Sequence, residues 1–96
     1  PLSLIAPYDR LSGQMAKIGA FIAVAVYDVV SGDPGVWEIA GVYEINKKND
    51  NVTQGALLYW DDTAKELTTT ASGNTLAGKA LEAAGTGVGV VKIVLG

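Results

Sequence analysis

The sequence contains one segment with the spacing of a phosphate-binding loop. Gly73 and Gly78 are separated by four residues and are followed by Lys79, the arrangement in which backbone amides and a lysine hold the phosphates of a nucleotide. In that motif the next residue is a serine or threonine whose hydroxyl binds Mg²⁺, whereas this chain has Ala80. The motif also opens a helix within a parallel α/β sheet, and this chain is too short and too rich in β-branched residues to form one. We therefore interpret the segment as a turn that leads into a strand, with Gly78 at a crowded position and Lys79 on the solvent face.

Two further segments have the residue types of a chemical site but are better explained as turns. Asp61 and Asp62 could act as a metal-binding or acid–base pair. Adjacent side chains on a strand point to opposite faces, so these carboxylates converge only if the chain turns there, and aspartate itself initiates turns by bonding to the backbone. Residues 85–89 have the glycines of a dinucleotide loop, but the third glycine is misplaced. We interpret both segments as turns between strands.

The composition removes several classes of function. The 96 residues include no histidine and no cysteine, which excludes a thiolate zinc site, a disulfide and a histidine base. Ten acidic residues against seven basic ones give a net charge of −3, and no basic run is longer than Lys47–Lys48, which argues against a nucleic-acid-binding face. The most apolar stretch, Ile18–Val30, is interrupted by Asp28 and is too short to span a bilayer. We predict no catalytic residue, cofactor, bound metal, nucleic-acid partner or membrane partner.

Short strands separated by tight turns are the expected architecture. Valine, isoleucine and threonine are abundant and the chain has twelve glycines, a composition typical of strands and turns. Turn signals recur roughly every 8–12 residues, which predicts an all-β fold. We expect a small antiparallel β-barrel or sandwich of about six to eight strands, with the polar loop 46–51 in solvent. The expected strands are residues 17–30 (as one or two strands), 36–45, 56–60, 66–70, 75–84 and 88–95.

The N-terminal segment, residues 1–13, is expected to form an extended arm, and residues 14–96 to form a single β domain. Pro7 ends strand pairing within the arm. A segment this short cannot form a core of its own, so we predict that it reaches a neighbouring molecule. The apolar side chains that would make this contact are Leu2, Leu4 and Ile5.

Alternation along the expected strands assigns the core. Every second side chain of residues 36–45 is apolar and mostly large, and residues 88–95 are apolar on both faces, so we expect the last strand to be buried on both sides. Tyr59 and Trp60 are neighbours that point to opposite faces, so one of these rings faces outward, where it suits a protein interface. The predicted core residues are Trp37, Ile39, Tyr43, Ile45, Leu58, Leu67, Leu76, Val91 and Ile93.

Several stretches of the sequence resemble a known family. The most specific are residues 55–61, Gly-Ala-Leu-Leu-Tyr-Trp-Asp, and residues 67–80, which begin Leu-Thr-Thr-Thr-Ala-Ser-Gly-Asn-Thr. Residues 41–45 with Lys47 after them, and the closing residues 91–95, fit the same pattern. Together they make the chain similar to the DUF2190 family of bacteriophage capsid cement, or decoration, proteins.

The resemblance implies a structural protein of the virion rather than an enzyme. Such a protein binds the outer surface of the mature phage head, assembled in the bacterial host cytoplasm, and stabilises contacts between major capsid protein subunits. A small domain without disulfides gains stability from subunit contacts, and three capsomers meet at each three-fold position, so we expect a homotrimer there. The residues expected at the capsid or subunit interface are Leu2, Leu4, Ile5, Tyr8, Tyr59 and Trp60.

Two other functions stay open on the sequence alone. A small β-barrel could serve as a binding module for an oligosaccharide or a nucleic acid. The segment around Lys79 leaves a nucleotide-dependent recombinase as the least favoured alternative. Retention of ATP with Mg²⁺ would identify the recombinase, whereas co-sedimentation with phage heads would identify the cement protein.

Overall fold

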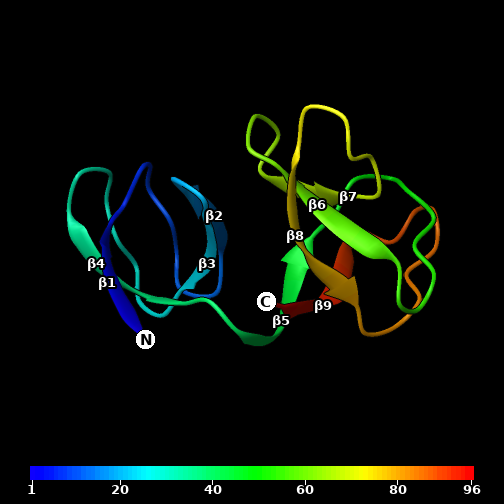
Figure 1. The fold of residues 1–96 in the computed structure, drawn as a ribbon, viewed down its shortest axis with the longest axis horizontal. Coiled ribbons are helices and arrows are strands. Elements are labelled where there is room, and N and C mark those ends of the chain that lie inside the picture. The colour runs from blue at the N-terminus through cyan, green and yellow to red at the C-terminus, as the bar shows by residue number, and fades with distance from the viewer.

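Nine β-strands and no helix make up the chain, which folds into two lobes that lie side by side (Figure 1). The computed structural model describes residues 1–96. The all-β prediction is therefore confirmed, with one strand more than the expected maximum. The strands are β1 (Leu2–Ile5), β2 (Met15–Ile18), β3 (Phe21–Ala25), β4 (Pro34–Glu38), β5 (Gly41–Asn46), β6 (Leu57–Asp61), β7 (Glu66–Thr68), β8 (Thr75–Ala80) and β9 (Val90–Leu95).

Each lobe is built around one antiparallel sheet. The first sheet has the strand order β1-β4-β3-β2, and the second has the order β5-β9-β8-β6-β7. The second sheet curls partway into a barrel, because Lys47, directly after β5, forms a parallel bridge to Leu67 of β7. Both sheets thus belong to the expected class of small barrels and sandwiches.

The two lobes are connected where the sequence pattern predicts an unbroken strand. Residues 36–45 form the end of β4 and most of β5, and these strands belong to different sheets. The chain leaves the first sheet at Ile39 and Ala40 and enters the second at Gly41, whose φ of 116° is a conformation that favours glycine. The prediction of one strand was wrong. Trp37 of β4 faces the core of the first lobe and Ile45 of β5 faces the larger core, so the apolar alternation continues across the connection although the strand does not.

The apolar stretch 17–30 is also divided by a turn. Ile18 pairs with Phe21, so only Gly19 and Ala20 connect β2 to β3. Gly19 has a φ of 61°, and Ala20 is not among the residues with positive φ. That combination is the type II′ turn, whose first central residue is usually glycine. Of the two alternatives considered for this stretch, the structure therefore has two strands.

The N-terminal segment, expected as an extended arm, is built into the first lobe. Residues Leu2–Ile5 form β1 and pair with β4 over four positions, from Leu2 opposite Trp37 to Ile5 opposite Pro34. The indole of Trp37 is fully buried and donates a hydrogen bond to the carbonyl oxygen of Leu4 (3.0 Å). Four buried alanines surround this ring and form the small core of the first lobe: Ala6, Ala16, Ala23 and Ala25.

A larger core joins the two lobes. It contains 14 buried residues, of which Met15, Ile22 and Val24 come from the first sheet and the rest from residues 45–95. Six of the nine predicted core residues are buried in one of the two cores, and Tyr43 packs against the larger one while half-buried. The six buried residues are Trp37, Ile45, Leu58, Leu67, Val91 and Ile93.

Three core predictions were wrong. Ile39 is exposed because it lies on the crossing between the lobes. Leu76 is exposed because β8 has a bulge: Leu58 and Tyr59 of β6 oppose Gly78 and Leu76, so Ala77 is the extra residue and the alternation of faces shifts there. The last strand is buried on one face only, since every second residue from Val90 onward is exposed.

Candidate interaction surface

The segment with phosphate-loop spacing is a turn and a strand. Residues 75–80 form β8, in which Lys79 is exposed and Gly78 is buried. A Cβ atom at Gly78 would collide with the carbonyl oxygen of Val94 on the neighbouring strand β9. The glycine is therefore required by close strand packing, as the sequence interpretation expected, and the segment does not lead into a helix.

Asp61 organises the turn between β6 and β7. Its Oδ1 accepts hydrogen bonds from the backbone N–H groups of Thr63 (2.9 Å) and Ala64 (3.0 Å), and its Oδ2 pairs with the ammonium of Lys48. The hydrogen bond from Lys48 is the largest cause that lowers the pKa of Asp61 to about 2. The turn interpretation of this aspartate is confirmed, and its carboxylate is fully engaged within the fold.

Asp62 connects the two lobes. Its Oδ1 accepts hydrogen bonds from the hydroxyl of Tyr8 (2.7 Å) and from the indole N–H of Trp60 (3.0 Å). Burial alone raises the pKa of Asp62. The two hydrogen bonds and the nearby ammonium groups of Lys65 and Lys17 lower the pKa by more than burial raises it, so the net shift is downward. Burial and the contact with Asp62 raise the pKa of Tyr8. The ammonium of Lys65 also lies 4.1 Å from the centroid of the Tyr8 ring.

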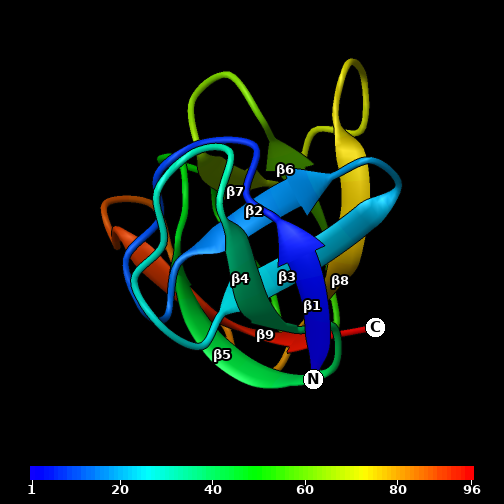
Figure 2. The same ribbon diagram turned by 90° about the vertical axis from the view of Figure 1, so that its left-hand side faces the viewer.

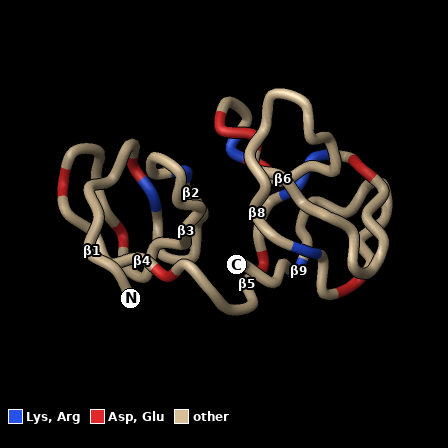
Figure 3. The backbone as a smooth tube through the Cα atoms, viewed as in Figure 1, with Lys and Arg blue, Asp and Glu red and all other residues tan.

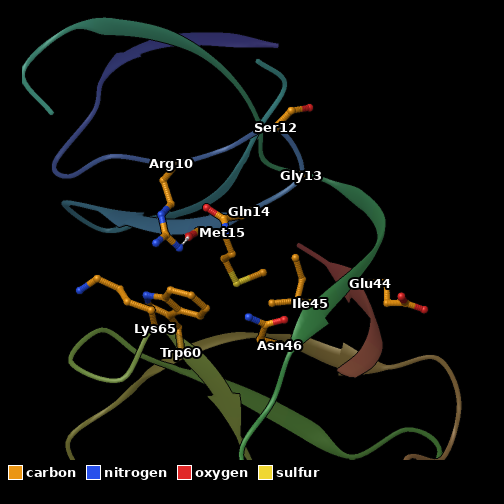
Figure 4. A pocket seen from close by; sticks show the side chains of 10 residues that line it. All are labelled: Arg10, Ser12, Gly13, Gln14, Met15, Glu44, Ile45, Asn46, Trp60 and Lys65. Atoms are coloured by element: carbon orange, nitrogen blue, oxygen red, sulfur yellow. Dashed lines mark hydrogen bonds between the residues drawn. The ribbon is translucent and has the colours of Figure 1, made fainter. Parts of the chain in front are cut away.

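A polar cleft of about 280 Å³ lies next to this contact, between the lobes. In Figure 4, Arg10 and Met15 extend from the first lobe toward Trp60, Lys65 and Ile45 of the second. The side chain of Gln14 stays on the first lobe, where its Oε1 accepts a hydrogen bond from the N–H of Leu11 (2.9 Å). The guanidinium of Arg10 already donates hydrogen bonds to the carbonyl oxygens of Met15 (3.2 Å) and Asp9 (2.8 Å). Both acceptors belong to the first lobe, so these hydrogen bonds fix Arg10 on its own side of the cleft. The structure contains no cluster of three or more metal-ligating side chains.

An apolar groove of about 370 Å³ is the second hollow between the lobes. Eight of its eleven lining residues are hydrophobic, and Lys79 is the charged residue among them. Four large side chains from both lobes remain substantially exposed in it, and we call this set the seam groove: Phe21 (44%), Ile39 (39%), Leu57 (46%) and Leu76 (55%).

Sequence reasoning missed the seam groove. Leu76 and Ile39 were assigned to the core, and Phe21 and Leu57 were not singled out. The interruption at Gly41 was the available signal that Ile39 leaves its strand. No residue type marks the bulge that turns Leu76 outward, because the bulge results from the pairing of β6 with β8.

The six residues expected at an interface are placed differently from one another. Leu2 and Ile5 are exposed on β1, whereas Leu4 and Tyr8 are half-buried against the core of the first lobe. Tyr59 is half-buried. Trp60 is 1% exposed and belongs to the larger core, so of the two neighbouring rings it is Tyr59 that retains exposed surface.

Charge does not single out one face of the molecule. Figure 3 shows acidic and basic positions on both lobes. Both termini lie on the lower side in Figures 1 and 2, and the C-terminal residues Leu95 and Gly96 line the seam groove. No helix in the structure has the length and apolar character needed to cross a membrane. Because charge is spread over both lobes, the exposed apolar residues are the feature that sets one part of the surface apart from another.

Comparison with known protein families gives one match. A family model described as phage cement protein matches residues 4–95. The chain belongs to the phage cement protein family. This cement protein is thus a structural protein of the phage capsid, and its expected place in the virion capsid and its kinship with the cement proteins are confirmed. No curated protein and no solved structure matches the chain.

Proposed function

We propose that this cement protein binds the outer surface of the mature phage head and stabilises contacts between major capsid protein subunits. The family match over residues 4–95 is the observation that carries this proposal. The seam groove supports it, because large apolar side chains that stay exposed in the free protein are typical of a surface that a partner covers. The exposed residues of β1, Leu2 and Ile5, add apolar surface on the first lobe.

The proposed mechanism is selective binding to one arrangement of the shell. Full burial of one large aliphatic side chain contributes roughly 1.5–3 kcal/mol, so the partly exposed residues of the seam groove can together provide substantial binding energy. A protein that binds the expanded shell more tightly than its precursor stabilises the expanded state by mass action. Many copies on a repeating shell multiply the effect.

We further propose that three copies act together as a homotrimer at three-fold and quasi-three-fold positions. A trimer there contacts three capsomers through identical surfaces. Leu2 and Ile5 are exposed and Tyr59 is half-buried, so all three have surface available for capsid or subunit contacts. Leu4 and Tyr8, the other two residues expected there, are partly buried against the core of the first lobe.

The test is binding to heads that lack the cement protein. Purified protein should co-sediment with expanded heads in copy numbers proportional to the capsid subunits, and should raise the temperature at which these heads rupture. Unexpanded precursor heads are the matched control and should bind less. Density from cryo-electron microscopy inside the shell, or as single copies at five-fold or six-fold centres, would contradict the outer-surface and trimer proposals.

A further inference from the structure

The two sheets have four edges, and side chains cover the edge formed by β2. The backbone N–H of Lys17 donates a hydrogen bond to the hydroxyl of Tyr8 (3.1 Å), and the carbonyl oxygen of Met15 accepts one from Arg10 (3.2 Å). Backbone groups at this edge therefore have partners within the chain. Natural proteins commonly cover edges in this way, because an open edge pairs readily with another strand.

The second sheet brings its two edges together at one end only. Lys47 and Lys48, directly after β5, approach Leu67 of β7. The backbone N–H of Lys48 donates a hydrogen bond to the carbonyl oxygen of Leu67 (2.9 Å). The edge strands β5 and β7 also contain one glutamate each, Glu44 and Glu66, and charged residues protect an edge from pairing with another strand. The edge that has neither cover nor charge is the one formed by β1.

The pairing of β1 with β4 determines which backbone groups point outward. The N–H of Ala6 donates to the carbonyl oxygen of Asp33 (2.9 Å), and on the far side of β4 the N–H of Val26 donates to the carbonyl oxygen of Val36 (2.9 Å). Bonded and non-bonded pairs alternate along an antiparallel ladder, so Leu2 and Leu4 direct their backbone groups toward β4. The N–H and C=O groups of Ser3 and Ile5 consequently point away from the sheet.

No part of the chain covers these outward groups. Neither Ser3 nor Ile5 takes part in any of the hydrogen bonds formed by side chains or by loops and turns. Leu2 is 36% exposed and Ile5 is 58% exposed, and β1 contains no charged residue and no proline. Apart from its short length of four residues, β1 therefore lacks the usual protection of an edge strand by charged side chains, proline or a covering segment. In Figure 1, β1 lies on the side of the first lobe that faces away from the second.

We propose that the outer edge of β1 binds an extended strand of the major capsid protein, which extends the first sheet to five strands. The inference rests on the proposed function for the identity of the partner. An extended backbone is the ligand whose donors and acceptors match the spacing of Ser3 and Ile5. The other candidate is β1 of a second copy. Two copies paired in this way are related by a two-fold axis, and each copy then has its β1 edge occupied, so this contact cannot build a three-fold assembly. The capsid protein is thus the occupant that agrees with both proposals.

Proline substitutions test the pairing directly. Ser3→Pro and Ile5→Pro each remove one outward N–H, and an edge strand tolerates proline where the N–H faces solvent. Ser3→Ala and Ile5→Ala are the matched controls, because they shorten the side chain and keep the N–H. We expect each proline variant to bind cement-free expanded heads roughly tenfold more weakly than its alanine control, the loss expected for one unmade hydrogen bond and a displaced strand.

Hydrogen exchange of the wild-type protein supplies a second measurement that does not depend on how the variants fold. The amides of Ser3 and Ile5 should exchange quickly in the free protein and slowly on heads, whereas the amide of Lys17 should be protected in both states. If the wild-type protein binds heads while these two amides still exchange quickly, the strand pairing is wrong and the proposed function stands. If the wild-type protein does not bind heads, the proposed function itself fails. Protection of the same amides in concentrated protein without heads would instead indicate pairing between two copies, and would overturn the capsid protein as the partner.

Discussion

Trp37 explains why the strands of the first lobe are rich in alanine. Its indole fills the centre of a lobe formed by only four short strands, and the other fully buried members of this core are all alanines. Gly35 follows the same rule, since a Cβ atom there would lie 3.0 Å from the indole nitrogen. The size of one aromatic ring thus sets the size of its neighbours.

Enlarging one of these alanines should destabilise the protein. Ala23 is fully buried, and Ala23→Leu would force side chains and backbone apart at a cost of about 1–3 kcal/mol. The urea midpoint of the purified variant measures this cost. Ala83→Leu is the matched control, because Ala83 is exposed and should leave the midpoint unchanged. Equal urea midpoints for the two variants would show that the core of the first lobe can accommodate a larger side chain at position 23.

A single truncation in the larger core should also be costly. Ile93 is fully buried on β9, so Ile93→Ala should reduce the free energy of unfolding by about 2–5 kcal/mol through lost burial and the cavity left behind. The exposed neighbour Val94 provides the control, and Val94→Ala should change it little. Chemical denaturation of the two variants compares the two faces of β9. A larger loss of stability for Val94→Ala than for Ile93→Ala would show that the face assigned here as exposed is the buried one.

At the scale of elements, the contact between Tyr8 and Asp62 fastens the N-terminal segment to the turn between β6 and β7. Tyr8→Phe removes the hydrogen bond to Asp62 and also uncovers the backbone N–H of Lys17. The free energy of unfolding should fall by about 1–3 kcal/mol, as for other hydrogen bonds to a charged group. Tyr27 is largely exposed, so Tyr27→Phe serves as the control and should have the stability of the wild-type protein in urea denaturation.

The turn between β6 and β7 should also make the protein sensitive to acid. The pKa of Asp61 falls from its ordinary value of 3.8 to about 2, and those of Asp50 and Asp62 are lowered as well. A carboxyl whose pKa is lower in the folded state stabilises the fold above the unfolded-state pKa, and this contribution disappears as pH falls through the folded-state value. Stability should therefore decrease between about pH 4 and pH 2. Asp61→Asn should flatten this decrease when urea midpoints are measured across the range, and an equally steep decrease in the variant would exclude Asp61 as a contributor.

The sequence predicted individual strands better than their junctions. The turn at Asp61, the hairpin of β6 and β7 and the crowded glycine at position 78 all follow from local residue chemistry, and the structure confirms them. The crossing at Ile39 and the bulge at Ala77 depend on which strands pair, and pairing is a property of the whole chain. Both errors moved a residue of the seam groove into the predicted core, so the candidate site was the part least accessible to the sequence.

The loop 46–51 shows the same limit, because it was expected to lie in solvent. Lys47 is buried, and its ammonium donates hydrogen bonds to the carbonyl oxygens of Lys48 (3.0 Å) and Asp50 (2.6 Å). The carboxylate of Asp50 accepts hydrogen bonds from the hydroxyl of Thr68 (2.6 Å) and the N–H of Thr69 (3.0 Å). A run of polar residues can therefore form a packed loop when backbone carbonyls and neighbouring strands satisfy it.

At the scale of the whole molecule, the seam groove exists only because the two lobes are docked. Phe21 and Ile39 come from the hairpin of the first lobe and from the crossing, whereas Leu57 and Leu76 come from the second sheet. The larger core and the Tyr8–Asp62 contact hold these elements together. If the seam groove contacts the capsid, as proposed, mutations that separate the lobes should weaken binding to heads even when they lie far from the groove.

The seam groove itself can be tested with a pair of leucines. Leu76 and Leu11 are exposed to similar extents, 55% and 60%, but only Leu76 lines the groove. If the groove contacts the capsid, Leu76→Ser should weaken binding to expanded heads roughly tenfold, which corresponds to about 1.4 kcal/mol of lost apolar contact. Neither variant should change the urea midpoint appreciably, because neither side chain belongs to a core, so a loss of binding would report on the surface alone. Leu11→Ser should bind as the wild-type protein does. Equal binding by all three proteins would remove the seam groove from the capsid interface and leave β1 as the candidate contact.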